Sequence, residues 1–166
     1  MPQHCCALVE SDRAKTLPIC PICKQKGRKV DTITLKALLA VSLLALRDGP
    51  YLFCRTAACP VVYFATDGSQ SFTKEQIRVL VYQKEPENLA VPVCYCFLHS
   101  PATIRAEFLT MGTSGVIEAI EAGIKAGRCA CEVRNPQGSC CLGNVRVVLK
   151  QIKHELNLTD SLGENL

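Results

Sequence analysis

The chain has 166 residues, of which 48% are apolar, so it is long enough for one ordinary domain or two small ones, and disorder is excluded as the default. Nineteen lysine and arginine residues against fifteen acidic residues give a net charge of +4, well short of the dense basic surface of a dedicated nucleic-acid binder. Aromatic residues make up only 5% of the chain, so small lobes need another source of stability.

The first segment has no apolar periodicity, and residues 1–13 are expected to form a flexible arm. Met1 to Cys6 lacks the basic and apolar regions of a secretory signal. The longest apolar stretch, residues 37–46, is about half of the roughly 20 residues that a membrane helix needs. We therefore expect a cytoplasmic protein without membrane insertion.

The segments that follow predict a lobe of one helix and short strands. Residues 34–47 carry apolar side chains at helical spacing, which predicts a helix that covers a sheet. Residues 51–53 and 61–64 are β-branched and aromatic, as is typical of strands, and Asp67-Gly68 marks a hairpin. Residues 77–82 alternate and predict a further strand.

The remainder of the chain predicts helices. A polar, proline-containing stretch over residues 84–92 separates it from the first lobe. Ser100-Pro101 is a typical helix start, and a second helix is expected to end at Gly127. A turn at Asn135-Pro-Gln-Gly precedes a third helix over residues 142–156.

The twelve cysteines form six close pairs, at positions 5 and 6, 20 and 23, 54 and 59, 94 and 96, 129 and 131, and 140 and 141. Disulfide frameworks are typical of secreted chains, and adjacent or one-apart cysteines bridge each other only with strain. In a reducing cytosol, paired thiolates are better explained as ligands of zinc or of iron-sulfur iron. We therefore expect metal sites in place of disulfides.

A zinc site is indicated by Cys20, Cys23, Cys54 and Cys59, which form a C-x2-C and a C-x4-C pair. Four thiolates suit tetrahedral zinc and leave no open coordination position, so such a site is structural. It would supply much of the folding free energy of a small lobe. Gly27, shortly after the first pair, is expected to provide a positive φ for the metal-binding turn.

A second metal site is indicated by Cys94-Tyr-Cys96, because this spacing brings two sulfur atoms to one iron of a cluster. The second iron needs its own pair of ligands. A pair that directly precedes the predicted third helix would gain from its free N–H groups, but spacing alone leaves the choice open. The candidates are Cys129, Cys131, Cys140 and Cys141.

Five short motifs follow one another along the chain: Cys20-Pro-x-Cys23, Tyr51-Leu-Phe-Cys54 with Cys59-Pro-Val-Val-Tyr-Phe64, Lys84-Glu85, Val93-Cys94-Tyr-Cys96 and Asn135-Pro-x-Gly-x-Cys-Cys141. Together they resemble the amino-terminal domain of the CopZ-type copper chaperone family over about residues 18–145. The carboxyl half is also similar to bacterioferritin-associated ferredoxin, a small helical module that binds a 2Fe-2S cluster. The resemblance implies an α+β fold, with a zinc-binding lobe of one helix and short antiparallel strands followed by a helical ferredoxin-like lobe.

The resemblance also implies the ligand sets. Zinc is assigned to the four cysteines named above for it, and the 2Fe-2S cluster to Cys94, Cys96, Cys131 and Cys141. Cys129 and Cys140 then become neighbours of the cluster, and they are open to three interpretations: spare thiols, a transient copper site or alternative ligands. The expected domains are an arm over 1–13, a zinc-binding domain over 14–90, a 2Fe-2S domain over 91–158 and a tail over 159–166.

The function implied by the resemblance is that of a metal-handling redox protein. Zinc is the scaffold, and a one-electron 2Fe-2S centre is directed at copper, from Cu(II) to Cu(I), or at another thiophilic metal. The expected partners are copper or another soft metal ion, a copper transporter or separate copper chaperone domain, and a redox partner protein, and Cu+ is an expected cofactor beside zinc and the cluster. Full-length members carry a Met-x-Cys-x-x-Cys loop that this chain does not contain, and Cys5-Cys6 is a candidate substitute. The alternative is a ferredoxin-like electron-transfer partner in iron storage or cluster assembly.

Residues outside the cysteine pairs form no catalytic constellation, so we expect no enzyme. The one exception is a cupric-reducing activity of the electron-transfer centre. His4, His99 and His154 are far apart in sequence and lack the partners of a catalytic triad. His99 is interpreted as a surface residue, with tuning of the cluster as the alternative. The basic residues 24–29 are interpreted as a solvated face, so no nucleic-acid partner is expected.

Overall fold

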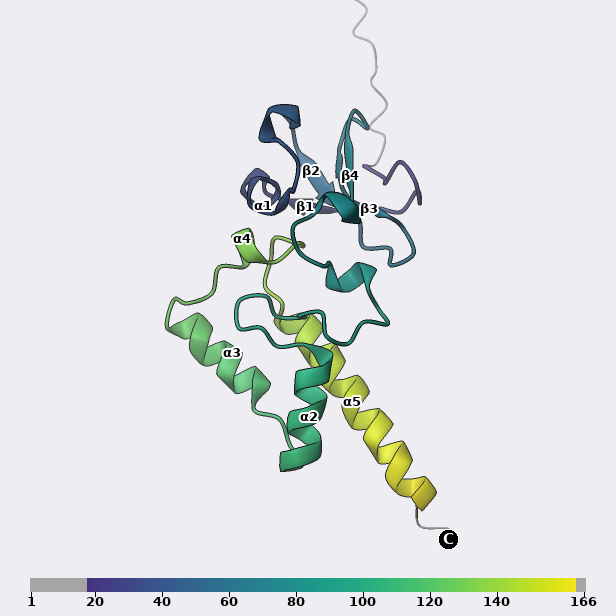
Figure 1. Cartoon of the computed structure of the whole chain (residues 1–166), viewed down its shortest axis with the longest axis vertical. Coiled ribbons are helices and arrows are strands. Elements are labelled where there is room, and N and C mark those ends of the chain that lie inside the picture. The colour runs from purple at the N-terminus through teal and green to yellow at the C-terminus, as the bar shows by residue number, and fades with distance from the viewer. Residues whose placement is uncertain (1–17, 164–166) are drawn as a thin grey trace, which may run out of the picture.

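The computed structural model describes residues 18–163, with side chains up to residue 156 (Figure 1). The predicted arm over residues 1–13, including Cys5 and Cys6, lies outside the described residues. Figure 1 shows a sheet at one end of the molecule, the helices α2, α3 and α5 at the other, and α4 between them. Within residues 18–163, no helix combines the length and apolar content that crossing a bilayer requires.

The sheet has four antiparallel strands in the order β1-β2-β3-β4. The strands are β1 (Arg28–Val30), β2 (Tyr51–Phe53), β3 (Val61–Ala65) and β4 (Ser71–Thr73). All residues of the two central strands are buried, so both faces of the sheet are covered. The predicted strands at 51–53 and 61–64 and the hairpin at Asp67-Gly68 are thereby confirmed.

The two faces of the sheet pack against different partners. Tyr51 and Phe53 join the core under helix α1 (Thr32–Leu38), whereas Leu52 between them joins a second core with the cysteines at 20, 54 and 59. This alternation is the ordinary two-residue period of a strand. In β3 the period shifts at an irregularity between Val61 and Tyr63, where the pairing with β4 slips by one residue.

The predicted helix over residues 34–47 is wrong in its carboxyl half, because α1 ends at Leu38. Leu39 continues as extended chain and forms a bridge with Ile77. The N–H of Arg78 donates to the carbonyl oxygen of Leu38 at 2.8 Å, which adds a second contact between these segments. This pairing outweighs the helical preference of an apolar run, and only a short 3-10 turn, Leu43–Ala45, follows.

The predicted strand over residues 77–82 is also wrong. Its pairing is limited to the bridge at Ile77, and the chain then enters a 3-10 turn at Tyr82–Lys84. Strand β1 and the four-residue helix α4 (Cys131–Arg134) were not predicted. Each of these short elements depends on a partner distant in sequence, which local periodicity does not report.

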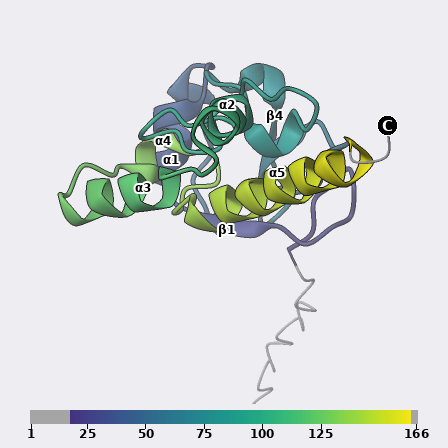
Figure 2. The same ribbon diagram turned by 90° about the horizontal axis from the view of Figure 1, so that it is seen from below.

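The second half contains the helices α2 (Pro101–Met111), α3 (Val116–Lys125) and α5 (Leu142–Gly163). Ser100 begins α2 as predicted, since its hydroxyl accepts the N–H of Thr103 at 3.2 Å. Figure 2, turned by 90°, shows α2 end-on with α3 and α5 extending to opposite sides of it. Helix α5 runs past the predicted end at residue 156. The mixed architecture confirms the α+β class, whereas the ferredoxin-like nature of this half stays a prediction.

Hydrogen bonds join the two halves of the molecule. The hydroxyl of Thr34 in α1 donates to the carbonyl oxygen of Glu132 in α4 at 2.6 Å. The buried hydroxyl of Tyr63 in β3 donates to the carbonyl oxygen of Pro136 at 2.6 Å. Tyr95 accepts the N–H of Tyr82 and donates to the carbonyl oxygen of Leu80, both at 2.8 Å. The chain that follows α4 is therefore held against the sheet and α1.

Candidate metal centres

The first group of thiols is the N-terminal tetrad, made of Cys20, Cys23, Cys54 and Cys59. The four sulfur atoms all lie within 4.8 Å of one another. The Cys20 and Cys59 sulfur atoms are 3.8 Å apart, and those of Cys23 and Cys54 are 3.6 Å apart. A zinc ion with Zn–S bonds of about 2.3 Å requires sulfur separations of about 3.8 Å at the edges of its tetrahedron. The donor set and spacing of the tetrad therefore fit zinc.

The tetrad is assembled by a turn and by the ends of two strands. Cys54 directly follows β2 and Cys59 lies just before β3, so one loop presents both. Cys20 and Cys23 lie in a tight turn, in which the N–H of Lys24 donates to the carbonyl oxygen of Cys20 at 3.0 Å. Lys24 adopts the positive φ of this turn, 59°. The expectation that Gly27 provides it is therefore wrong.

Gly27 is required for space instead. A Cβ atom at this position would lie 2.6 Å from Phe64 Cζ and 2.7 Å from Leu52 Cβ. Both neighbours belong to the small core that holds the tetrad against the sheet. A glycine here lets the backbone of the metal-binding turn approach that core closely.

The thiols of the tetrad differ in acidity. Burial raises the pKa of Cys20 to about 12 and also raises that of Cys59. Burial also opposes ionisation of Cys23, but hydrogen bonding with the Thr56 hydroxyl, whose oxygen lies 3.3 Å from the sulfur, with the Gln25 N–H and with the Cys54 thiol lowers its pKa to about 6. Cys23 is thus favoured as a thiolate near neutral pH.

A buried lysine supports the same loop. Lys84 is only 5% exposed, and its ammonium group donates to the carbonyl oxygen of Thr56 at 2.7 Å. Thr56 lies between Cys54 and Cys59, so the positive charge is held beside a site that carries net negative charge when four thiolates bind one zinc ion. The Lys84-Glu85 motif marked this position in the sequence, but it did not show that the two side chains have different partners. Glu85 pairs with Lys74 at 2.9 Å.

Zinc affinity is expected to fall as the pH falls from about 8 to about 6. Cys20 and Cys59 have raised pKa values, so both thiols are protonated across this range and must each release a proton to bind zinc. Apparent affinity should therefore drop by about 100-fold or more per pH unit. Below the pKa of Cys23, about 6, a further proton competes and the dependence should steepen. Competition with a chromogenic zinc chelator at each pH measures this slope. A tenfold change per unit, or less, would contradict the prediction.

The second group, which we call the C-terminal thiol group, contains five cysteines. Cys96 lies 3.7 Å from Cys131 and 4.0 Å from Cys129, and Cys129 lies 3.3 Å from Cys131, all between sulfur atoms. Cys94 and Cys141 belong to the adjacent helical core, against which Cys96 also packs. The structure thus places Cys96 and Cys131 beside Cys129, and the assignment of a cluster to Cys94, Cys96, Cys131 and Cys141 stays a prediction. Cys140 is exposed, and all ten cysteines within residues 18–163 are free thiols.

Local backbone contacts fix the positions of these cysteines. The N–H groups of Val93 and Cys94 both donate to the carbonyl oxygen of His99, at 2.8 and 3.0 Å, which closes a tight loop around Cys94-Tyr-Cys96. The N–H of Ala130 donates to the Cys96 sulfur at 3.3 Å. The amide group of buried Asn135 donates to the carbonyl oxygen of Ser139 at 2.7 Å. This last contact makes the predicted turn that returns the chain to Cys141.

The thiols of the C-terminal thiol group also differ in pKa. A hydrogen bond from the Cys141 thiol lowers the pKa of Cys94 to about 7 and that of Cys131 to about 5, while the same bonds raise the pKa of Cys141. Burial raises the pKa of Cys96 to about 12. Four cysteine thiolates are the donor set of a 2Fe-2S cluster. Since the group offers five sulfur atoms, some already favoured as thiolates, its donors fit such a cluster.

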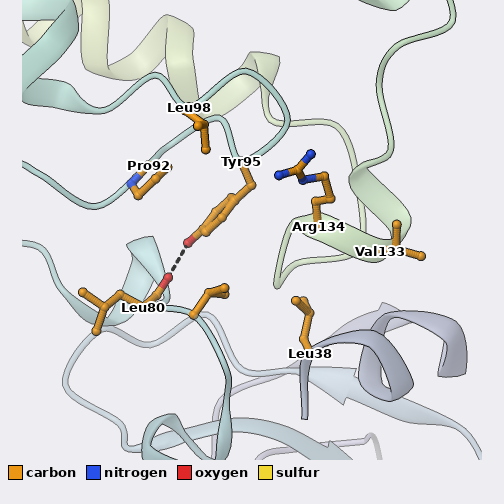
Figure 3. Close-up of a pocket in the computed structure, with 8 residues that line it drawn as sticks. Leu38, Leu80, Pro92, Tyr95, Leu98, Val133 and Arg134 are labelled. Atoms are coloured by element: carbon orange, nitrogen blue, oxygen red, sulfur yellow. Dashed lines mark hydrogen bonds between the residues drawn. The ribbon is translucent and has the colours of Figure 1, made fainter. Parts of the chain in front are cut away.

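An apolar pocket of about 370 Å³ lies beside the C-terminal thiol group (Figure 3). Figure 3 shows Tyr95, between two of the cysteines in sequence, pointing across to the Leu80 carbonyl, with Arg134 on the other side. Leu80 and Leu98 are 56% and 64% exposed. The pocket is lined by Leu38, Val79, Leu80, Pro92, Tyr95, Leu98, Val133 and Arg134.

The sheet, the covering helix and the closed tetrad together define a zinc-binding domain. Residues 17–78 match the zinc binding domain of the CopZ family. Residues 17–78 thus resemble a CopZ-type zinc-binding domain, as the sequence motifs indicated.

Two relatives extend the likeness beyond this domain, and the chain is homologous to the first. The copper chaperone CopZ of Archaeoglobus fulgidus is 32% identical over 122 residues, which are 74% of this chain and 57% of the relative. The X-ray structure of the CopZ N-terminal domain from the same organism superposes with a TM-score of 0.66 and 29% identity, covering 78% of this chain and 96% of that chain. The chain therefore spans little more than half the length of the curated relative.

Proposed function

We propose that this chain is a cytoplasmic metal-handling redox protein. In this proposal the N-terminal tetrad holds zinc as a scaffold, and Cys94, Cys96, Cys131 and Cys141 hold a 2Fe-2S cluster that exchanges one electron. The observation that carries the proposal is the separation of the thiols into two groups in space, one the closed N-terminal tetrad and one centred on Cys96, Cys129 and Cys131 with Cys94 and Cys141 in the adjacent core.

The residues of the C-terminal thiol group suit electron exchange at a surface. Cys94 and Cys141 are buried in the helical core, at 0% and 2% exposure, and so anchor one side of the site. Cys96 is half-buried on the other side, where the N–H of Ala130 stabilises negative charge on its sulfur. A 2Fe-2S group supplies a one-electron couple when bound. The site is therefore shielded from solvent at Cys94 and Cys141 and accessible at Cys96.

We propose cupric ion as the acceptor of this electron. The homologous protein is named a copper chaperone, and thiolate ligands prefer cuprous to cupric ion. One electron converts one cupric ion to one cuprous ion, and a redox partner protein restores the electron to the site. The same chemistry applies to other thiophilic ions, which are alternative recipients. A copper transporter or a separate chaperone domain would then take the cuprous ion.

A second candidate function is electron transfer to another protein, in iron storage or cluster assembly. The apolar pocket beside Tyr95 favours it, because exposed Leu80 and Leu98 offer a docking surface next to the loop of Cys94 and Cys96 (Figure 3). Direct reduction of cupric ion distinguishes the two candidates.

Metal analysis and electron paramagnetic resonance of the anaerobically purified chain test the proposal. We expect about one zinc, two iron and two sulfide ions per chain, visible absorption that bleaches on reduction, and a paramagnetic signal in the reduced protein. The reduced protein should then convert about one equivalent of cupric ion to cuprous ion, detected with a cuprous-specific chelator. A colourless protein that binds zinc alone would overturn the proposal. A protein that contains the cluster but leaves cupric ion unreduced would favour the second candidate.

A further inference from the structure

We propose that Cys96, Cys129 and Cys131 form a three-thiolate binding site for cuprous ion. Cys129 was left open by the sequence and belongs to none of the ligand sets assigned above. The inference deepens the proposed function, on which it rests for the choice of copper as the metal that the chain meets. The site itself rests on the arrangement of the three side chains.

The three sulfur atoms form a nearly equilateral triangle, with sides of 3.3, 3.7 and 4.0 Å. A point equally distant from all three lies about 2.1 Å from each sulfur, close to the length of a metal–thiolate bond. The triangle accepts an ion in its plane after a small expansion.

The number of ligands selects the metal. Cys96, Cys129 and Cys131 lie within 4.8 Å of one another as a group of three, in contrast to the four members of the N-terminal tetrad. A structural zinc ion requires four protein ligands, whereas three soft thiolates suit cuprous ion. The chain thus offers one site for each metal, distinguished by the count of sulfur atoms.

The triangle is also accessible. Cys96 and Cys129 are partly exposed, while Cys94 and Cys141 behind them are buried. Cys129 lies in the loop between α3 and α4 and is partly exposed. An incoming ion therefore meets the sulfur atoms of Cys96 and Cys129 first, and the buried Cys131 completes the triangle behind them.

Cys96 and Cys131 are shared with the ligand set proposed for the 2Fe-2S cluster. A cuprous ion in the triangle and the cluster in its own site consequently exclude each other. Binding of the ion displaces the protons of whichever thiols carry them and transfers no electron. Cys129 is the residue that distinguishes the two states, because it contacts the ion but is absent from the proposed cluster set.

Cuprous titration of the full chain tests this inference. The chain is prepared anaerobically, loaded with zinc and free of iron, and titrated with cuprous ion against a chromogenic cuprous chelator. Three proteins are compared: the wild type, Cys129→Ser, and Cys140→Ser as the control, since Cys140 is exposed. X-ray absorption counts the sulfur ligands of bound copper, and metal analysis and circular dichroism confirm that each protein keeps its zinc and fold.

We expect the wild type and Cys140→Ser to bind about one cuprous ion through three sulfur atoms, and Cys129→Ser to bind it about tenfold or more weakly through two. Unchanged affinity and sulfur count in Cys129→Ser would overturn the inference. So would copper that enters only by displacing zinc from the N-terminal tetrad. Iron-loaded samples run in parallel separate the two claims: a wild type that binds no iron but shows the three-sulfur copper site removes the proposed redox function and leaves this inference standing.

Discussion

Replacing Cys54 with serine is expected to remove zinc from the protein and to unfold its amino-terminal half. Cys54 is 1% exposed and lies at the end of β2, so the change breaks the tetrad from inside the core. Structural zinc contributes on the order of 10 kcal/mol to the folding free energy of a small domain. A substitution that removes such a metal is therefore expected to lower the free energy of unfolding by more than about 4 kcal/mol. The expected fall in Tm is roughly 10 °C or more.

Few other contacts replace the metal when it is lost. The turn that carries Cys20 and Cys23 exposes its two largest apolar residues, since Ile19 is 46% and Ile22 is 61% exposed. The sulfur atoms therefore provide most of the attachment of this turn to the sheet. Thermal denaturation and zinc analysis of Cys54→Ser, with Cys140→Ser as the matched control, measure the effect. A Cys54→Ser protein that keeps its zinc and melts with the control would refute the assignment of the tetrad.

Gly138→Ala is expected to destabilise the junction between the two halves by about 2–4 kcal/mol. Gly138 has a φ of 65°, and a Cβ atom there would lie 2.8 Å from Val30 Cγ2 and 2.9 Å from Thr34 Oγ1. Val30 and Thr34 are buried and cannot move aside freely. The turn that aligns Cys131 with Cys141 should be displaced, and iron retention should fall with stability.

Gly127→Ala is the matched control for this prediction. Gly127 has nearly the same φ, 67°, but a Cβ atom there would meet no atom within 4 Å. Its substitution should therefore show the backbone penalty alone, about 1 kcal/mol. Urea unfolding of both variants measures the difference. Equal destabilisation of the two would show that the contact with Val30 and Thr34 carries no energy.

The sequence predicted elements whose signals are local. Tyr51–Phe53 combines aromatic and apolar residues, and Ser100-Pro101 is followed by Thr103, whose N–H the serine caps. These features depend on neighbours a few residues away, so they survive in the folded chain. The pairs Cys20 and Cys23, and Cys54 and Cys59, also have local spacing that suits one ion, and their four sulfur atoms lie together in the structure.

The features that the sequence missed depend on distant partners. Residues 39–46 have a helical pattern, yet the backbone of Leu39 pairs with Ile77, 38 positions away. The role of Lys84 depends on Thr56, and the space constraint at Gly27 depends on Phe64. Cys129 looked equivalent to three other cysteines by spacing, and only the path of the loop before α4 places it beside Cys96. Such partners follow from tertiary packing, which overrides local preference.

The hydroxyl contacts between β3 and Pro136, and between α1 and Glu132, impose an order on the maturation of this protein. Tyr63 and Thr34 belong to the zinc-dependent half, and the carbonyl groups that they hold belong to the segment between Cys131 and Cys141. That segment has no regular structure of its own beyond the four residues of α4. We therefore expect zinc to bind before the second site is aligned, and removal of zinc to disturb the second site as well as the first.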